Sequence, residues 1–216
     1  MTRSLNLMAV GKRGAISYAP QTTGTSPMTI KLIVGLRNPG MAYERTRHNA
    51  GGWFVEELVK SDHAGFKVDK KLQGEFADLT IENRALRVLL PLSFMNHSGL
   101  SVHLTSQFYR IEPHEILVVH DDLDLPVGTV KLKIDGGHGG HNGLRDVISQ
   151  LGTKHFYRLR LGIAHPSDKT AVVDYVLGKP SAEDKQLIND AISRALVVLP
   201  LIIEGQIEKA MTTLHR

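Results

Sequence analysis

The chain has 216 residues, which is long enough for one domain with a substantial hydrophobic core and too short for two large ones. It contains no cysteine, so disulfides, zinc–thiolate sites and a cysteine nucleophile are excluded, and a reducing compartment, the cytoplasm, is expected. The net charge is +4, but residues 1–27 hold three of the 26 basic residues and none of the 22 acidic ones. The remainder is nearly neutral, so a polyanionic partner would need a local basic patch.

Residues 1–27 differ from the rest of the chain. They show no hydrophobic periodicity, and they end in a Thr/Gly/Ser/Pro cluster just before Met28. A secretory signal is not expected, because no apolar core of about 7–15 residues follows the charges. We interpret this segment as a disordered N-terminal extension or as the product of an upstream start codon, and we place the folded domain at residues 28–216.

Strand and helix patterns alternate along this domain. In chain order we predict a buried strand at 30–36, a helix from 48 to about 60, strands at 76–81 and 86–92, a helix at 94–109, a buried strand at 115–120, a strand at 130–134, a helix at 142–151, a strand at 157–163, helices near 170–177 and 181–204, and a short last helix. The longest apolar run, 195–203, is too short to span a membrane and is expected to be a buried helix segment. The alternation predicts a single α/β layered domain with a mixed, largely parallel central sheet flanked by helices.

Polar and glycine-rich clusters follow the predicted strands or precede the next helix. They contain Asn38, His48, Asn96, Asp121 and Asn142, with Asp121 beginning an acidic turn after the strand at 115–120. Because ligands of open α/β sheets bind beyond the carboxyl ends of strands, we expect one crevice to collect these side chains. A histidine backed by a carboxylate can take a proton from water, and asparagines can hold water and polarise a carbonyl.

The sequence has no G-x-S-x-G motif, so direct attack by water is favoured over an acyl-enzyme. Structural interpretations of the same residues remain open at this point. A histidine at a helix start is usually a surface or capping residue, an aspartate after a strand is commonly an N-cap, and Asn38 before Pro39-Gly40 is ordinary turn chemistry.

The glycine-rich loop at 136–143 has the spacing of neither a dinucleotide-binding fingerprint nor a P-loop. His138 and His141 within it are candidate metal ligands, but no glutamate accompanies them, and a loop does not give them a shared face. Basic residues gather beside the loop, and period-two spacing places each strand pair on one side of the sheet. A phosphate site and a solvated strand face are equally compatible with these residues: Lys131, Lys133, Arg158 and Arg160, flanked by Arg145 and Lys154.

Six motifs in register resemble the bacterial-type peptidyl-tRNA hydrolases. They are GLRNPG (35–40), YERTRHNAG (43–51), FMNHSG (94–99), HDDLDLP (120–126), GGHGGHNGL (136–144) and RLRLGIAHP (158–166). The resemblance extends over about residues 28–216 and has no place for residues 1–27. It implies hydrolysis of the ester between an N-blocked peptide and the 3′ end of tRNA during ribosome rescue, by a cofactor-free, metal-free cytoplasmic monomer.

The resemblance also implies a role for individual residues. His48 matches the general base, Asp121 matches the residue that stabilises its basic form, and Asn38 matches a position that selects N-blocked substrates and contributes to the carbonyl site. Positions that contact the tRNA end or the nascent peptide are matched by Tyr43, Phe94, Asn96 and Asn142, with Met95 and His141 beside them. Lys133 and Arg160 match a pair that holds the tRNA 5′-phosphate.

Two positions depart from the family pattern. Asp135 stands where glycine or a neutral residue is frequent, and Ala164 stands where glycine is frequent. Two rival functions remain. The first is an RNA-binding module that has lost catalysis, and the second is a metal-dependent peptidase or amidase that uses His138 and His141.

Overall fold

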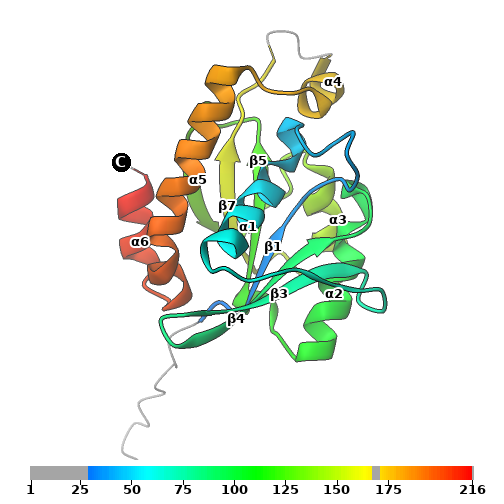
Figure 1. Cartoon of the computed structure of the whole chain (residues 1–216), viewed down its shortest axis with the longest axis vertical. Coiled ribbons are helices and arrows are strands. Elements are labelled where there is room, and N and C mark those ends of the chain that lie inside the picture. The colour runs from blue at the N-terminus through cyan, green and yellow to red at the C-terminus, as the bar shows by residue number, and fades with distance from the viewer. Residues whose placement is uncertain (1–28, 167–170, 216) are drawn as a thin grey trace, which may run out of the picture.

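The structure is a computed structural model of the chain, in which residues 29–166 and 171–215 are described. The segment 1–27, interpreted above as an extension, lies outside the described residues. Seven strands form one sheet in the order β2-β3-β4-β1-β5-β7-β6, whose central strands β4, β1, β5 and β7 are labelled in Figure 1. Their bounds are β1 (Leu32–Gly35), β2 (Lys67–Asp69), β3 (Gly74–Ile81), β4 (Arg84–Pro91), β5 (Ile116–Asp122), β6 (Val130–Ile134) and β7 (Tyr157–Gly162).

The centre of the sheet is parallel and its two sides are antiparallel. Strands β4, β1, β5 and β7 run parallel to one another, whereas β2, β3 and β4 are joined by antiparallel pairing and β6 pairs antiparallel with β7. This confirms the predicted mixed sheet with a largely parallel core. All four residues of β1 are buried, as is expected for a central strand that is covered on both faces.

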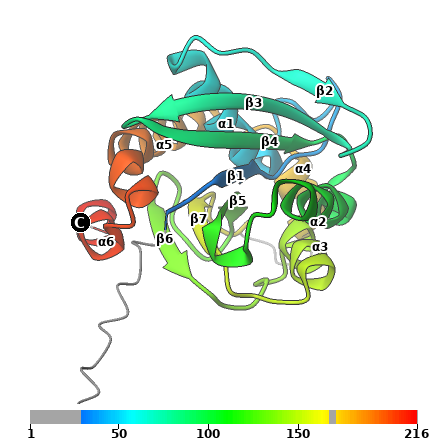
Figure 2. The ribbon, with the colours of Figure 1, turned by 90° about the horizontal axis from the view of Figure 1, so that it is seen from below.

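Two hydrophobic cores lie on the two faces of the sheet. Ile33 and Leu117 belong to the core that includes helices α1 (Ala50–Ser61), α5 (Ala182–Ile203) and α6 (Ile207–Leu214). Leu32 and Val118, whose side chains point to the opposite face, belong to the core that includes α2 (Ser98–Tyr109) and α3 (Asn142–Leu151). Figure 2 shows α2 and α3 side by side, away from α5 and α6.

The chain leaves neighbouring strands toward opposite faces, which creates a crevice at their carboxyl ends. After β1 the chain enters the 3-10 helix η1 (Arg47–Asn49) and α1, and after β4 it enters η2 (Met95–His97) and α2. Because α1 and α2 cover different faces, the ends of β1 and β4 form a switch point of the kind at which α/β sheets bind ligands.

Helix α1 lies very close to the sheet, because its second residue is glycine. A Cβ atom at Gly51 would collide with the carbonyl oxygen of Val119 in β5. The missing side chain therefore lets the start of α1, and the η1 turn before it, approach the carboxyl end of β5.

Three features differ from the predictions. The short polar strand β2 was not predicted, because only three residues pair with β3 and they lack an apolar run. Asp121 and Asp122 are the last paired residues of β5 and do not lie in a turn after it. By length and composition α5 has the properties of a membrane-spanning helix, although its apolar side is buried in the core; one such helix is weak evidence for a span.

Candidate active site

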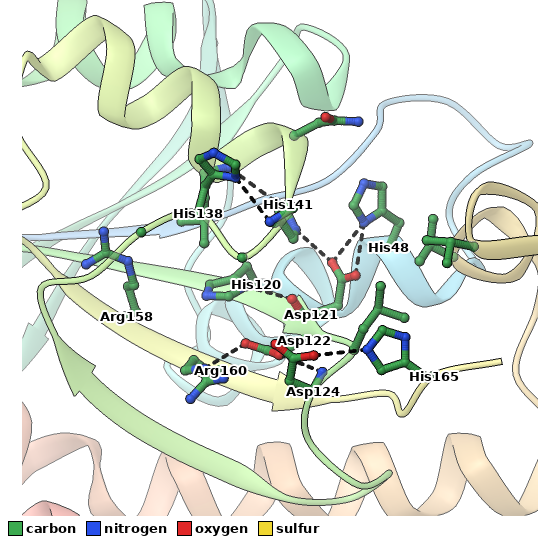
Figure 3. A pocket seen from close by; sticks show the side chains of 18 of the residues that line it. His48, His120, Asp121, Asp122, Asp124, His138, His141, Arg158, Arg160 and His165 are labelled. Atoms are coloured by element: carbon green, nitrogen blue, oxygen red, sulfur yellow. Dashed lines mark hydrogen bonds and ion pairs between the residues drawn. The ribbon is translucent and has the colours of Figure 1, made fainter. Parts of the chain in front are cut away.

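His48 and Asp121 meet at the carboxyl end of β5. His48 comes from η1, which precedes α1, and Asp121 is the penultimate residue of β5. Both side chains are buried, and Nδ1 of His48 lies 3.0 Å from each carboxylate oxygen of Asp121. Because a carboxylate only accepts, Nδ1–H is the donor, which leaves Nε2 of His48 as the atom that can take a proton (Figure 3).

His48 and Asp121 each stabilise the charged form of the other. Burial lowers the pKa of His48, but attraction to Asp121 and their hydrogen bond outweigh it, so the pKa lies above the ordinary value. Burial likewise raises the pKa of the Asp121 carboxyl, while His48 and His141 lower it more strongly, so Asp121 stays ionised. The pair is therefore arranged to stabilise an imidazolium at His48.

His141 is a second support for Asp121. It is the N-cap of α3, where its Nδ1 accepts a hydrogen bond of 3.2 Å from the backbone N–H of Leu144. Nδ1 is therefore unprotonated, and the proton on Nε2 is donated to Oδ1 of Asp121 at 3.0 Å. Both ring nitrogens are used within the protein, so His141 acts here as a neutral donor to the carboxylate.

His120 lies beside this group and was not singled out from the sequence. Its Nδ1 donates to the backbone oxygen of Asp121 at 2.6 Å, and its ring is 5.0 Å from that of His141. Burial lowers the pKa of His120 to about 3, so the ring is neutral. The sequence offered no reason to select His120, because it is the last residue of the apolar run that predicts the strand at 115–120.

Asn38 is held by two hydrogen bonds with Asn49, the N-cap of α1, and by one hydrogen bond across the crevice from Met95, after β4. Its backbone N–H donates to Oδ1 of Asn49 at 2.8 Å, and Nδ2 of Asn49 donates back to the Asn38 carbonyl at 2.9 Å. The backbone N–H of Met95 donates to Oδ1 of Asn38 at 2.8 Å. This orients the side-chain amide of Asn38, with its oxygen occupied and its Nδ2 protons left to donate. Asn49 is a further residue whose role the sequence did not indicate.

The remaining residues expected at the substrate end fall into two groups. Asn96, Asn142 and Phe94 are exposed, and Phe94 makes an edge-to-face contact with Tyr43 at 5.9 Å between ring centroids. The side chain of Met95 instead lies in the hydrophobic core, where it packs under Gly143. Only the backbone of Met95 therefore contributes to the crevice.

A cavity of about 600 Å³ opens beside His48 and Asp121. It is lined by the glycine-rich loop on one side and by the three valines of helix α4 (Val172–Leu177) on the other. Six of the predicted site residues line it, whereas Asn38, Tyr43, Phe94, Met95 and Asn96 do not. The six are His48, Asp121, Lys133, His141, Asn142 and Arg160.

The four basic residues on β6 and β7 share one face of the sheet but differ in their availability. Lys131 pairs in register with Arg160, and Lys133 pairs with Arg158. Lys133 is exposed, and Arg160 donates to Asp122 at 2.6 Å through Nε while its other nitrogens remain free of described partners. Arg158 is buried and supports the loop backbone, since Nη2 donates to Gly136 O at 2.7 Å and Nη1 to Phe156 O at 3.0 Å. Arg158 is thus not the surface phosphate ligand that its spacing suggested.

The two departures from the family pattern have a common backbone explanation. Asp135 and Ala164 both have positive φ angles, of 60° and 59°. Glycine adopts this conformation without a steric penalty, whereas alanine does so at a cost of roughly 1–2 kcal/mol. Asp135 is also turned toward His155, to which it pairs at 2.9 Å, and not toward Lys133.

The same geometry bears on a metal site. Nitrogen and oxygen atoms of His48, Asp121 and His141 lie within 4.8 Å of one another, a spacing that also suits a cation. The N–H groups of both histidines point at the carboxylate, however, and a metal ion would have to replace those protons. His138, the other candidate ligand, does not belong to this cluster; its Nδ1 accepts from Gly140 N at 3.1 Å.

Comparison with known proteins gives a consistent result. The peptidyl-tRNA hydrolase family matches residues 32–216. The peptidyl-tRNA hydrolase of Legionella pneumophila (strain Lens) is 57% identical over 188 residues, covering 87% of this chain and 100% of the relative. That of Neisseria meningitidis serogroup A is 52% identical over 187 residues, covering 87% and 97%. The crystal structure of peptidyl-tRNA hydrolase from Acinetobacter baumannii aligns with a TM-score of 0.84 at 46% identity, covering 88% of this chain and 97% of that one.

Proposed function

Because the chain belongs to the peptidyl-tRNA hydrolase family, and so hydrolyses peptidyl-tRNA to release peptide and tRNA, we propose that His48 is the general base of this reaction. The observation that carries the proposal is the contact of Nδ1 with both oxygens of Asp121, 3.0 Å each, at the edge of a cavity. This contact fixes the tautomer in which Nε2 is unprotonated. That nitrogen is the one needed to activate water.

The proton follows a closed path in this mechanism. Nε2 of His48 takes a proton from water as the oxygen attacks the ester carbonyl, and Asp121 stabilises the resulting imidazolium. The tetrahedral intermediate then collapses, the bond to the 3′ oxygen of tRNA breaks, and the imidazolium returns its proton to that oxygen. The products are tRNA with a free hydroxyl and the peptide carboxylic acid, which ionises to the carboxylate by releasing a proton to solvent.

Asn38 is the proposed donor to the oxyanion. Its Oδ1 is held by the backbone of Met95 at 2.8 Å, so the orientation of Nδ2 is set before the substrate arrives. A donor that does not need to reorganise stabilises the developing negative charge, and removal of one such donor costs about 10²–10³ in kcat in other hydrolases. The same amide is the proposed contact to the blocked amino group.

The tRNA end and the peptide are proposed to lie around this centre. The exposed ring of Phe94, in contact with the half-buried ring of Tyr43, offers an aromatic surface on which a terminal base can stack. Asn96 and Asn142 are exposed and offer hydrogen bonds at the same end of the sheet. Lys133 and Arg160 are proposed to hold a phosphate of the acceptor stem, since both line the cavity from neighbouring strands.

The proposed enzyme needs no cofactor and no metal ion, and we propose that it acts as a cytoplasmic monomer. The support for metal independence is the tautomer of His141: a neutral donor to Asp121 already supplies the second interaction that a cation would make. These proposals follow the family expectation stated from the sequence.

The test replaces His48 by alanine and measures release of tRNA from an N-acetylaminoacyl-tRNA in single-turnover reactions. Turnover should disappear while tRNA affinity, measured by filter binding, changes little, because His48 contacts Asp121 and not the phosphate site. The matched control is His114→Ala, which removes an exposed histidine and should retain full activity. Turnover of His48→Ala within threefold of the unaltered enzyme would refute the general-base role.

A further inference from the structure

Helix α4 forms one side of the cavity but is too short to hold its own position. It has six residues, and isolated helices below about 12–15 residues are marginal in water. Val172 is partly exposed and Val173 is largely exposed, and both line the cavity. Val176, which is buried at the edge of the core, also lines it. Contacts with other elements must therefore set the distance between this apolar side and His48.

Arg47 supplies most of these contacts at the carboxyl end of α4. Its backbone N–H donates to Gly178 O at 3.1 Å, and Nη1 donates to Tyr175 O at 3.3 Å and to Lys179 O at 3.0 Å. Its guanidinium carbon lies 4.1 Å from the centre of the Tyr175 ring, and Nη2 is 3.5 Å from Asp184. The cation thus meets carbonyls at a helix end, an aromatic face and a carboxylate together.

The other side of α4 is held by Tyr175. Its hydroxyl donates to the Ile163 carbonyl at 2.6 Å, directly after β7. The ring of Tyr175 therefore lies between Arg47 on one side and the sheet on the other. Arg47 and Tyr175 form one connected unit, and the loss of either releases part of the other's restraint.

Arg47 is the residue before His48 in η1, and the two side chains point to different partners. His48 reaches Asp121, whereas Arg47 reaches α4 and the start of α5. We propose that Arg47 is a positioning residue, which fixes the valine side of the cavity against His48 so that the ester is placed for attack. The proposal rests on the role of His48 proposed above, and it assigns to Arg47 no contact with the substrate.

The planar fork of the arginine is essential to this arrangement. One nitrogen reaches two backbone carbonyls while the plane lies over the Tyr175 ring, which a lysine ammonium cannot reproduce with a single point charge. A lysine at position 47 would keep the attraction to the helix end and to Asp184. It is therefore expected to restore part of the function.

The experiment measures kcat, KM and tRNA affinity for Arg47→Met, Arg47→Lys, Tyr175→Leu and the double variant Arg47→Met/Tyr175→Leu, all well below their melting temperatures. Misplacement of reacting groups by about 1 Å costs up to roughly 10²-fold, so we expect kcat of Arg47→Met to fall about 10–100-fold. KM and tRNA affinity should change by less than about threefold, because uniform binding is not removed. Arg47→Lys should be intermediate, and the double variant should lose less than the product of the two single losses.

The matched control is Arg87→Met. Arg87 also lies over an aromatic ring, that of Tyr109 at 3.5 Å, and pairs with Asp78 at 2.6 Å, but it does so on β4 and does not line the cavity. The melting temperature of Arg87→Met should fall, while its kcat should stay unchanged. The proposal is overturned if folded Arg47→Met keeps kcat within about twofold, if Arg87→Met loses as much, or if the loss appears in KM alone. If Arg47→Met does not fold, the kcat values of Tyr175→Leu and Arg47→Lys test the positioning role by the same criteria. Retained turnover in His48→Ala would refute the general-base role separately from the positioning role of Arg47.

Discussion

Replacing Asp121 by asparagine tests the centre of the site with almost no change in shape. Asp121 receives N–H groups from both His48 and His141 at 3.0 Å. An asparagine keeps one acceptor and turns the other oxygen into a donor. His141 cannot adapt by moving its proton, because its Nδ1 already accepts the N–H of Leu144. The retained oxygen therefore stays at the Oδ1 position to accept from His141, and the new NH₂ takes the Oδ2 position, also 3.0 Å from Nδ1 of His48. A donor at that position disfavours the Nδ1–H tautomer and favours the one with the proton on Nε2.

In that tautomer His48 cannot take a proton from water. The variant also loses the negative charge that raises the pKa of His48. Loss of orientation and of imidazolium stabilisation together predicts a fall of about 10²–10⁴-fold in kcat/KM, or roughly 3–5 kcal/mol in the barrier. The active form of His48 is neutral, so activity rises as pH rises through its pKa. Removal of Asp121 lowers this pKa and should move the acidic limb of the profile to lower pH.

The assay follows release of tRNA from N-acetylaminoacyl-tRNA between pH 5 and 9, with tRNA affinity and the melting temperature as parallel measurements. Asp190→Asn, which removes one exposed acid of α5, controls for net charge and should leave the profile unchanged. Activity of Asp121→Asn within tenfold of the unaltered enzyme, or an acidic limb at the same pH, would refute the assigned hydrogen-bond roles.

Three further outcomes are expected. Lys133→Ala should weaken tRNA binding and reduce the slope of log affinity against log salt by about 1, with kcat for a short N-blocked aminoacyl ester unchanged; an unchanged slope would remove Lys133 from the phosphate site. Activity should survive dialysis against a strong chelator, whereas loss that is reversed by a divalent cation would assign the cluster of His48, Asp121 and His141 to a metal. Ala164→Gly should raise the free energy of unfolding by about 0.5–1 kcal/mol in urea titrations, since it removes a side chain at φ 59°; a decrease would contradict the strain argument.

The order of strands and helices could be predicted because apolar runs and helical spacing differ clearly in this chain. The placement of His48 and Asp121 at neighbouring strand ends followed from the same pattern and the rule for parallel sheets. The pattern did not indicate how deeply individual polar side chains are buried. Asp121 pairs within β5 although its polar side chain suggested a turn, because hydrogen bonds from two imidazoles compensate the cost of burying its charge.

Other residues could not be assigned from the sequence, because their roles depend on contacts between distant segments. His141 belongs to a glycine-rich loop by sequence, but its nitrogens connect α3 to β5. Arg158 and Arg160 lie two residues apart on the same face of β7, yet Arg158 is buried and supports the backbone at Gly136, whereas Arg160 pairs with Asp122 through Nε alone. Met95 stands between two exposed residues of the motif, but its side chain fills the core under α3.

The N-cap of α3 has a consequence for how this protein loses activity on heating. Helix ends fray before whole domains unfold, and the amide of Leu144 is in the first turn of its helix. Once that turn opens, the imidazole at position 141 loses the hydrogen bond that fixes its ring and its tautomer, and its support of the carboxylate weakens. Inactivation should therefore begin below the global melting temperature, and hydrogen exchange at the Leu144 amide should report it in advance.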